Sequence, residues 1–107
     1  METIKIGEHV RTHKGKIYKV TNVYVLKVIC GHTSLRYNTI KKHNPNILYI
    51  IEKDDYVNGC RVFEVKEKGV VVYLKIENGC TTYDFILKED IKSIVTKEQF
   101  EANKYIV

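Results

Sequence analysis

Residues 51–65 of this 107-residue chain read IEKDDYVNGCRVFEV, and residues 4–20 repeat the pattern as IKIGEHVRTHKGKIYKV. Each copy has an apolar start, an acidic turn, a short strand ending in Val, a glycine turn and an alternating apolar–polar strand. Similarity that recurs at this spacing predicts two small all-β units in tandem.

Turn residues are clearest in the second copy. Asn58-Gly59 and Asn78-Gly79 lie between alternating apolar residues, which is the strongest short-range signal for a β-hairpin. With a further turn at Lys68-Gly69, they predict strands over 60–66, 70–77 and 80–86, after a first strand at Tyr56-Val57 and before a closing segment at 90–95. Five short strands in a meander are typical of an SH3-like barrel.

The first copy follows the same plan with weaker turn signals. It predicts strands over 16–20, 23–30 and 33–38, and residues 39–42 occupy the place of the closing segment. Pro45 marks a connector, because the residue before a proline avoids helical backbone. We therefore expect a mainly β protein: an SH3-like unit at 1–46 and a second SH3-like unit at 47–107. Units this small bury little surface alone, so the two are expected to pack together.

The C-terminal segment changes character. Thr96 and Gln99 have the spacing of a helix capping box. They predict a short helix over 97–103, with Phe100 packed on the second unit. Residues 105–107 are expected to add a final strand at a sheet edge.

Composition argues for a binding protein and against an enzyme. No segment approaches the roughly 20 apolar residues needed to span a bilayer, and three cysteines without a C-x-x-C pair fit a reducing, cytoplasmic setting. Cys30 and His32 are the one thiol–imidazole pair at short range, but Gly31 between them predicts a turn that would spoil their geometry.

Other routes to chemistry are weaker still. His9, His13, Cys30 and His32 have no short-range ligand spacing, so neither a metal nor another cofactor is expected. The acidic pair Asp54-Asp55 is interpreted as solvated turn acids.

Charge is distributed unevenly between the halves. Residues 1–46 hold nine Lys and Arg against two acids, a net of +7, whereas residues 47–107 hold nine against eleven, a net of −2. This asymmetry indicates a polyanionic partner for the first half, although lysines that keep sheet edges soluble explain it about equally well. Tyr18, Tyr24 and Tyr37 interleave with the charges. The candidate binding residues are Arg11, His13, Lys14, Lys16, Arg36, Lys41, Lys42 and His43.

Two stretches resemble known proteins. Residues 6–17, with Gly7-Glu8 before a short strand, resemble the opening of SH3-like and KOW-type barrels. Residues 54–62 and the tail at 90–101 resemble small uncharacterised proteins of clostridial and other Firmicutes phages and prophages. The resemblance covers most of the chain and implies no catalytic residues. It implies an accessory role in a bacterial host cell, such as inhibition of a defence system in the manner of anti-CRISPR proteins.

The leading hypothesis is therefore a non-enzymatic phage or prophage protein. Its basic half would contact nucleic acid or a host nucleoprotein such as a defence effector. The alternative is a protein-interaction or phage-assembly module that uses its sheet edges or its acidic C-terminal half. Exposed sheet edges also make a homodimer a reasonable expectation.

Overall fold

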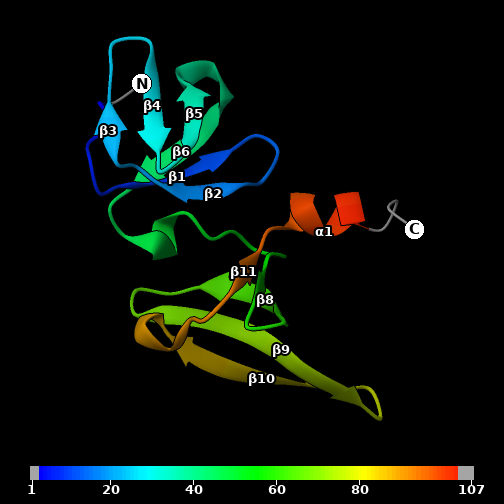
Figure 1. Cartoon of the computed structure of the whole chain (residues 1–107). Helices are drawn as coiled ribbons and strands as arrows, with labels where there is room; N and C mark the ends of the chain where they lie inside the picture. Colours follow the sequence, from blue (N-terminus) through cyan, green and yellow to red (C-terminus); the bar gives the residue numbers. More distant parts are fainter. Residues whose placement is uncertain (1–2, 104–107) are drawn as a thin grey trace. The chain divides into compact units, whose positions relative to one another are not determined.

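The computed structural model describes the backbone of residues 3–103 and the side chains of residues 3–74 and 78–102, and it is rich in β-strands. The chain divides into two compact units, Met1–Ile50 and Ile51–Val107 (Figure 1). The sequence places the boundary four residues earlier, at 46/47. Residues 47–50 belong to the first unit, where the Ile50 carbonyl accepts a hydrogen bond from Arg11 Nη1 at 3.1 Å. Within this segment Ile47–Tyr49 forms a 3₁₀ turn (η2), in which the Asn46 side chain accepts a hydrogen bond from the Leu48 amide at 3.1 Å.

The first unit contains two three-stranded antiparallel sheets. The first sheet has the order β2-β1-β6, from β1 (His9–Thr12), β2 (Ile17–Lys19) and β6 (Ile40–Asn44). The second has the order β3-β4-β5, from β3 (Asn22–Val23), β4 (Lys27–Cys30) and β5 (Thr33–Arg36). A 3₁₀ turn, η1 (Tyr37–Thr39), leads from β5 into β6.

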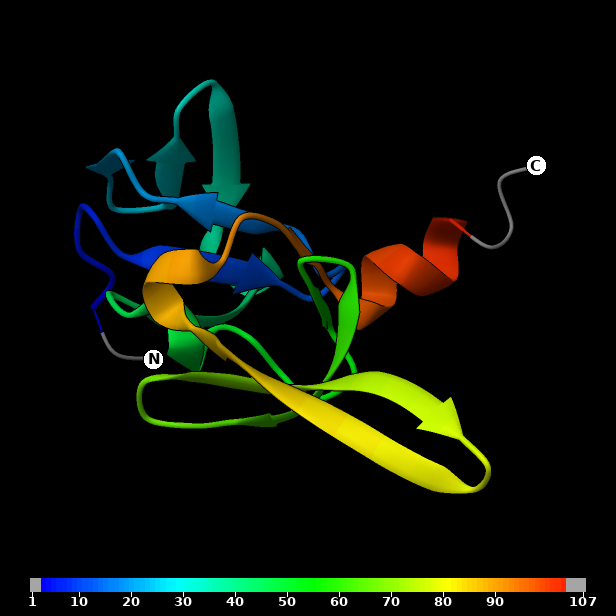
Figure 2. The same cartoon turned by 90° about the horizontal axis from the view of Figure 1, so that it is seen from below.

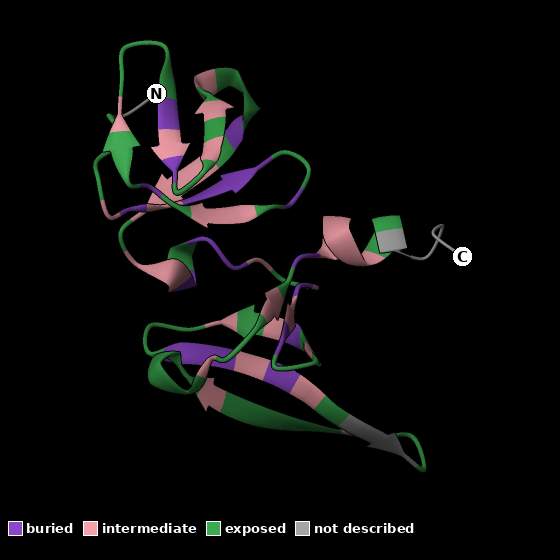
Figure 3. Cartoon of the chain, in the orientation of Figure 1, coloured by how far each residue is buried: buried purple, intermediate pink, exposed green. Residues whose placement is uncertain are grey.

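The core of the first unit comes from the apolar positions of both sheets. Its buried members are Ile4, Val10, Val20, Val28, Cys30 and Ile40, with Tyr18, Val23, Leu35 and Tyr37 packed against them. β-Branched residues dominate the set, as expected for a pleated surface buried on one side. Figure 3 shows buried positions alternating with an exposed and an intermediate one along β4.

One strand of the prediction is broken. The sequence predicts a single strand over 23–30, but residues 24–26 form a bend that separates β3 from β4. The Tyr24 amide donates to the Lys27 carbonyl at 2.9 Å across this bend. The bend holds no Gly, Asn or Asp, so the usual sequence signal for a turn is absent.

The second unit contains a five-stranded antiparallel sheet of order β10-β9-β8-β7-β11. The strands are β7 (Tyr56–Val57), β8 (Cys60–Val65), β9 (Gly69–Glu77), β10 (Cys80–Leu87) and β11 (Ile94–Val95). A 3₁₀ turn, η3 (Lys88–Asp90), precedes β11. Both Asn-Gly turns are confirmed: Asn58 and Asn78 have φ of 51° and 50°, as two-residue hairpins with positive φ require.

The β9–β10 hairpin depends on a glycine. β9 and β10 are the longest strands of the sheet, and Figure 2 shows their hairpin as a ribbon that continues beyond β8. A Cβ added at Gly69 would lie 2.2 Å from the carbonyl oxygen of Ile86 and 2.9 Å from the Phe85 ring. Gly69 is therefore required by close approach of the neighbouring strand.

The predicted C-terminal helix is confirmed as α1 (Lys97–Asn103). The Gln99 amide donates to Thr96 Oγ1 at 3.3 Å, and the Thr96 amide donates to Gln99 Oε1 at 3.2 Å, which is the predicted capping box. Phe100 stacks on Tyr56 with ring centroids 4.4 Å apart. The expected strand at 105–107 lies outside the described residues.

The interpretation of Asp54-Asp55 as two solvated turn acids is wrong for Asp55. Its side chain is fully buried, with Oδ2 accepting from the Glu52 amide at 2.8 Å and Oδ1 from the Lys97 amide at 2.9 Å. The carboxylate thus joins the segment before β7 to the first residue of α1. Asp54 differs, because it forms an exposed ion pair with Arg61 at 2.8 Å.

The two units share an order of elements. In each unit the last strand pairs antiparallel with the first, β6 with β1 and β11 with β7. The last strand follows a 3₁₀ turn in both units, directly in the first and after a few residues in the second. This agrees with the repeat in the sequence. The strands of residues 3–103 form three sheets of linear order, so the tandem SH3-like barrels stay a prediction.

Candidate nucleic-acid interface

The β1–β2 turn presents the first group of cations. It is closed by two hydrogen bonds, from the Thr12 amide to the Lys16 carbonyl at 2.9 Å and from the Lys16 amide to Thr12 Oγ1 at 3.1 Å. Gly15 has a φ of 84°, which side chains rarely adopt. The turn leaves His13, Lys14 and Lys16 exposed.

These residues line an open hollow of about 590 Å³ on the first unit, which we call the basic hollow. β5 and η1 supply further lining residues, and Tyr18 of β2, which also packs against the core, lines the same hollow. Its lining residues are Thr12, His13, Lys14, Lys16, Tyr18, Thr33, Ser34, Leu35, Arg36, Asn38 and Thr39. A concave site with cations, hydroxyls and an aromatic ring can bind phosphate groups and stack a base.

The cations of the basic hollow are not neutralised by described neighbours. Among the side chains that the structure describes, Lys14, Lys16 and Arg36 make no ion pair. Residues 3–50 contain one acid, Glu8, and it is buried. The described surface of the first unit therefore presents positive charge without a compensating exposed carboxylate.

Glu8 is occupied by local partners. Its Oε1 lies 3.0 Å from His43 Nδ1, and its Oε2 accepts from the Lys5 amide. Burial alone would raise the pKa of the Glu8 carboxyl, but the contacts with His43 and the Lys5 amide together lower that pKa below its ordinary value. Glu8 is therefore a structural carboxylate of the first unit.

Four of the eight predicted residues meet in the basic hollow, namely His13, Lys14, Lys16 and Arg36. The prediction that Arg11 is a binding residue is wrong. Arg11 is fully buried, and its Nη1 donates to the Ile50 carbonyl at 3.1 Å. A buried guanidinium cannot contact a ligand at the surface. His43 is likewise committed to Glu8.

Lys41 and Lys42 are outside the lining of the basic hollow. Lys42 lies opposite Arg11 in the β1–β6 register, and Lys41 is the extra residue where that register shifts. Both have contacts within the described residues. Sequence reasoning missed Asn38, which lines the hollow from η1 and had no signal beyond its place after Tyr37.

The thiol–imidazole hypothesis gains no support from the geometry. Gly31 has a φ of 64° in the β4–β5 turn, as the sequence predicts. Cys30 is buried, and burial raises the pKa of its thiol. A nucleophilic cysteine needs the opposite shift.

Among the described side chains of residues 3–74 and 78–102, no three His, Cys, Asp or Glu gather where they could hold a metal ion. In the same part of the chain, no helix combines the length and apolar character that crossing a membrane requires. Comparisons with protein-family models, with curated proteins and with solved structures gave no match to this chain.

Proposed function

We propose that the first unit binds nucleic acid through the basic hollow. The observation that carries this proposal is the set of three cations, Lys14, Lys16 and Arg36, that face one hollow without an ion pair among the described residues. Phosphate groups neutralise such a set and release condensed counterions, which makes binding strong at low salt. Tyr18 lines the same hollow and offers an aromatic ring for stacking.

The fold supports this proposal in outline. We regard both units as SH3-like, because the last strand of each returns to the first near a 3₁₀ turn. Loops of a small barrel are natural contact surfaces. An accessory role in a phage or prophage, including inhibition of a host defence complex, remains the broader hypothesis and rests on the sequence resemblance.

The test is fluorescence anisotropy with labelled DNA and RNA at about 50 and 200 mM salt, the range over which phosphate contacts lose affinity. The variant carries Lys14→Glu, Lys16→Glu and Arg36→Glu. A matched control makes the same charge change at exposed positions of the second unit, with Lys68→Glu, Lys88→Glu and Lys92→Glu.

We expect the wild-type protein and the control to bind with a steep salt dependence. The basic-hollow variant should lose binding, or retain it with a log–log salt slope shallower by roughly two units, since each phosphate contact contributes about 0.7 to 0.9. Equal binding by all three proteins would remove the proposal.

A second candidate, protein interaction, is favoured by the β9–β10 hairpin. β10 is an edge strand, and Leu74, Tyr83, Phe85 and Leu87 are exposed on this hairpin. Apolar side chains beside an open edge suit pairing with another chain. Such binding would respond weakly to salt, and Tyr83→Ser would weaken it while leaving nucleic-acid binding unchanged.

A further inference from the structure

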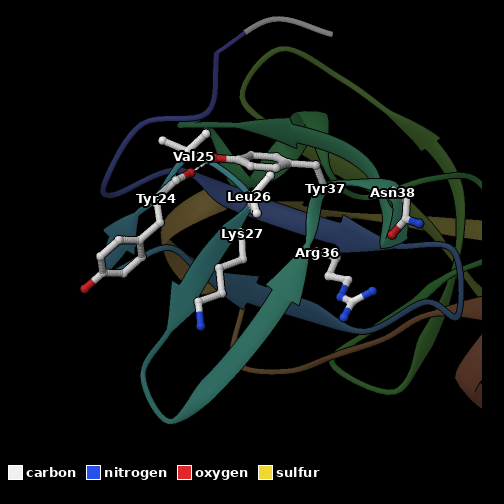
Figure 4. Close-up of a pocket in the computed structure, with 7 residues that line it drawn as sticks. All are labelled: Tyr24, Val25, Leu26, Lys27, Arg36, Tyr37 and Asn38. Carbon is white, nitrogen blue, oxygen red and sulfur yellow. Dashed lines mark hydrogen bonds between the residues drawn. The ribbon is translucent and has the colours of Figure 1, made fainter.

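A second hollow of about 900 Å³ adjoins the basic hollow on the first unit, and we call it the tyrosine hollow. It is lined by Tyr24, Val25, Leu26, Lys27, Arg36, Tyr37 and Asn38 (Figure 4). Arg36 and Asn38 line both hollows. The two therefore form one continuous surface on which a single extended ligand can lie.

The bend that lines this hollow is unusually apolar for a turn. Val25 is 92% exposed and Leu26 is 80% exposed, at the bend between β3 and β4. Neither has a positive φ, and neither residue type is favoured at turns. Large aliphatic side chains held in water at such a position indicate a contact surface.

The wall of the hollow is fixed before a ligand arrives. The Tyr37 hydroxyl donates to the Tyr24 carbonyl at 2.5 Å, and Tyr37 also packs against the core. Figure 4 shows the Tyr37 ring reaching toward the bend that carries Val25 and Leu26. An aromatic ring held in this way loses little conformational freedom when a ligand binds.

The charges beside the hollow point to an anionic ligand. Lys27 on β4 lies directly opposite Arg36 on β5. Like charges in this position destabilise an antiparallel pair, and neither side chain forms an ion pair with any other side chain that the structure describes. An anion placed between them would relieve the repulsion.

Resting on the proposed function, we propose that the ligand is single-stranded nucleic acid with one unpaired base in the tyrosine hollow. The base packs against Tyr37 and Leu26, while phosphates contact Arg36 and the cations of the basic hollow. The Asn38 amide makes no side-chain hydrogen bond within the described residues and is available to a base edge. A lipid surface would contact Val25, Leu26 and the cations, but it would form no specific hydrogen bond with this amide. Bases stacked inside a duplex cannot enter such a hollow.

The test compares three labelled probes of equal length: a single strand, the corresponding duplex and an abasic strand that keeps the phosphates but lacks bases. The hollow variant carries Val25→Ser and Leu26→Ser, which are exposed positions and should leave the fold intact. Tyr83→Ser is the control, because it alters an exposed aromatic residue of the second unit.

We expect the wild-type protein to bind the single strand at least about 5-fold more tightly than the abasic strand, which is the weaker limit for stacking of one base. The variant with Val25→Ser and Leu26→Ser should bind the single strand only as tightly as the wild-type protein binds the abasic strand. The Tyr83→Ser control should have the affinities of the wild-type protein. Lys27→Glu adds an independent readout. It should weaken binding while raising the urea midpoint, because it converts a like-charge pair into an attractive one.

Equal affinity for the single strand and the abasic strand would overturn the base site and leave the phosphate contacts of the proposed function standing. Failure to bind any probe would overturn both. Sedimentation with phosphatidylserine vesicles that is lost in the hollow variant, without any preference for bases, would overturn the proposal in favour of a lipid surface.

Discussion

Replacement of Asp55 by Asn tests the buried carboxylate that joins two distant parts of the second unit. In the native protein Oδ1 and Oδ2 accept from the Lys97 and Glu52 amides, at 2.9 and 2.8 Å. A hydrogen bond to a charged group contributes about 1.5 to 3 kcal/mol. The asparagine oxygen can replace one acceptor, but its NH₂ group faces the other amide as a second donor.

We therefore expect Asp55→Asn to lower the free energy of unfolding by about 1.5 to 3 kcal/mol, which is roughly a 10- to 150-fold change in the folding equilibrium. Urea denaturation followed by far-ultraviolet circular dichroism measures it. Amide hydrogen exchange adds a local readout, since protection should fall first at Glu52 or Lys97, where a donor has lost its acceptor.

Asp54→Asn is the matched control, one residue away. The Asp54 side chain is 42% exposed and pairs with Arg61 at the surface, an interaction that contributes about 0.2 to 1 kcal/mol. Its φ of 74° also suits Asn. The reasoning is refuted if Asp55→Asn stays within about 0.5 kcal/mol of wild type, the usual range for a neutral surface change. It is also refuted if both variants lose the same stability.

Three further predictions concern pH, strand packing and thiol reactivity. Because the folded state lowers the pKa of Glu8 below 4.5, its stabilisation is complete above that pH and is lost as the pH falls through the folded value. Glu8→Gln should therefore have a flatter stability profile below about pH 4.5 in acid titration, and an unchanged profile would contradict this assignment. Gly69→Ala should cost about 1 to 3 kcal/mol or more in urea denaturation, because its Cβ meets a backbone oxygen that cannot move alone; a neutral result would mean that the strands separate easily. Ellman's reagent should label exposed Cys80 quickly and buried Cys30 only on unfolding, and fast labelling of all three thiols in folded protein would disprove the burial.

The elements that follow local chemistry could be predicted from the sequence. Asn58-Gly59 and Asn78-Gly79 set positive φ within two residues, so the hairpins of the second unit were placed closely. The capping box at Thr96 likewise depends on residues three apart. The bend at Tyr24–Leu26 has no such residue types. Besides the local bond from the Tyr24 amide to the Lys27 carbonyl, it is held by a hydrogen bond from Tyr37, thirteen residues later in the chain.

The candidate site was predicted only in part, for a related reason. Charged residues are expected at the surface, which holds for Lys14 and Lys16 on their turn. Arg11 and Asp55 break the rule, and each has a backbone partner far away in the chain, at 39 and 42 residues. No local sequence pattern predicts a hydrogen bond to a backbone group so far away in the chain.

The bond from Arg11 to the Ile50 carbonyl has a consequence for dissecting the gene. The connector at Pro45 invites a truncation after residue 46, but that fragment would retain a buried guanidinium and lack the carbonyl that receives it. Loss of an acceptor for a buried charged donor costs more than loss for a neutral one. A fragment of residues 1–50 keeps both groups, so the smallest first unit worth expressing ends at Ile50.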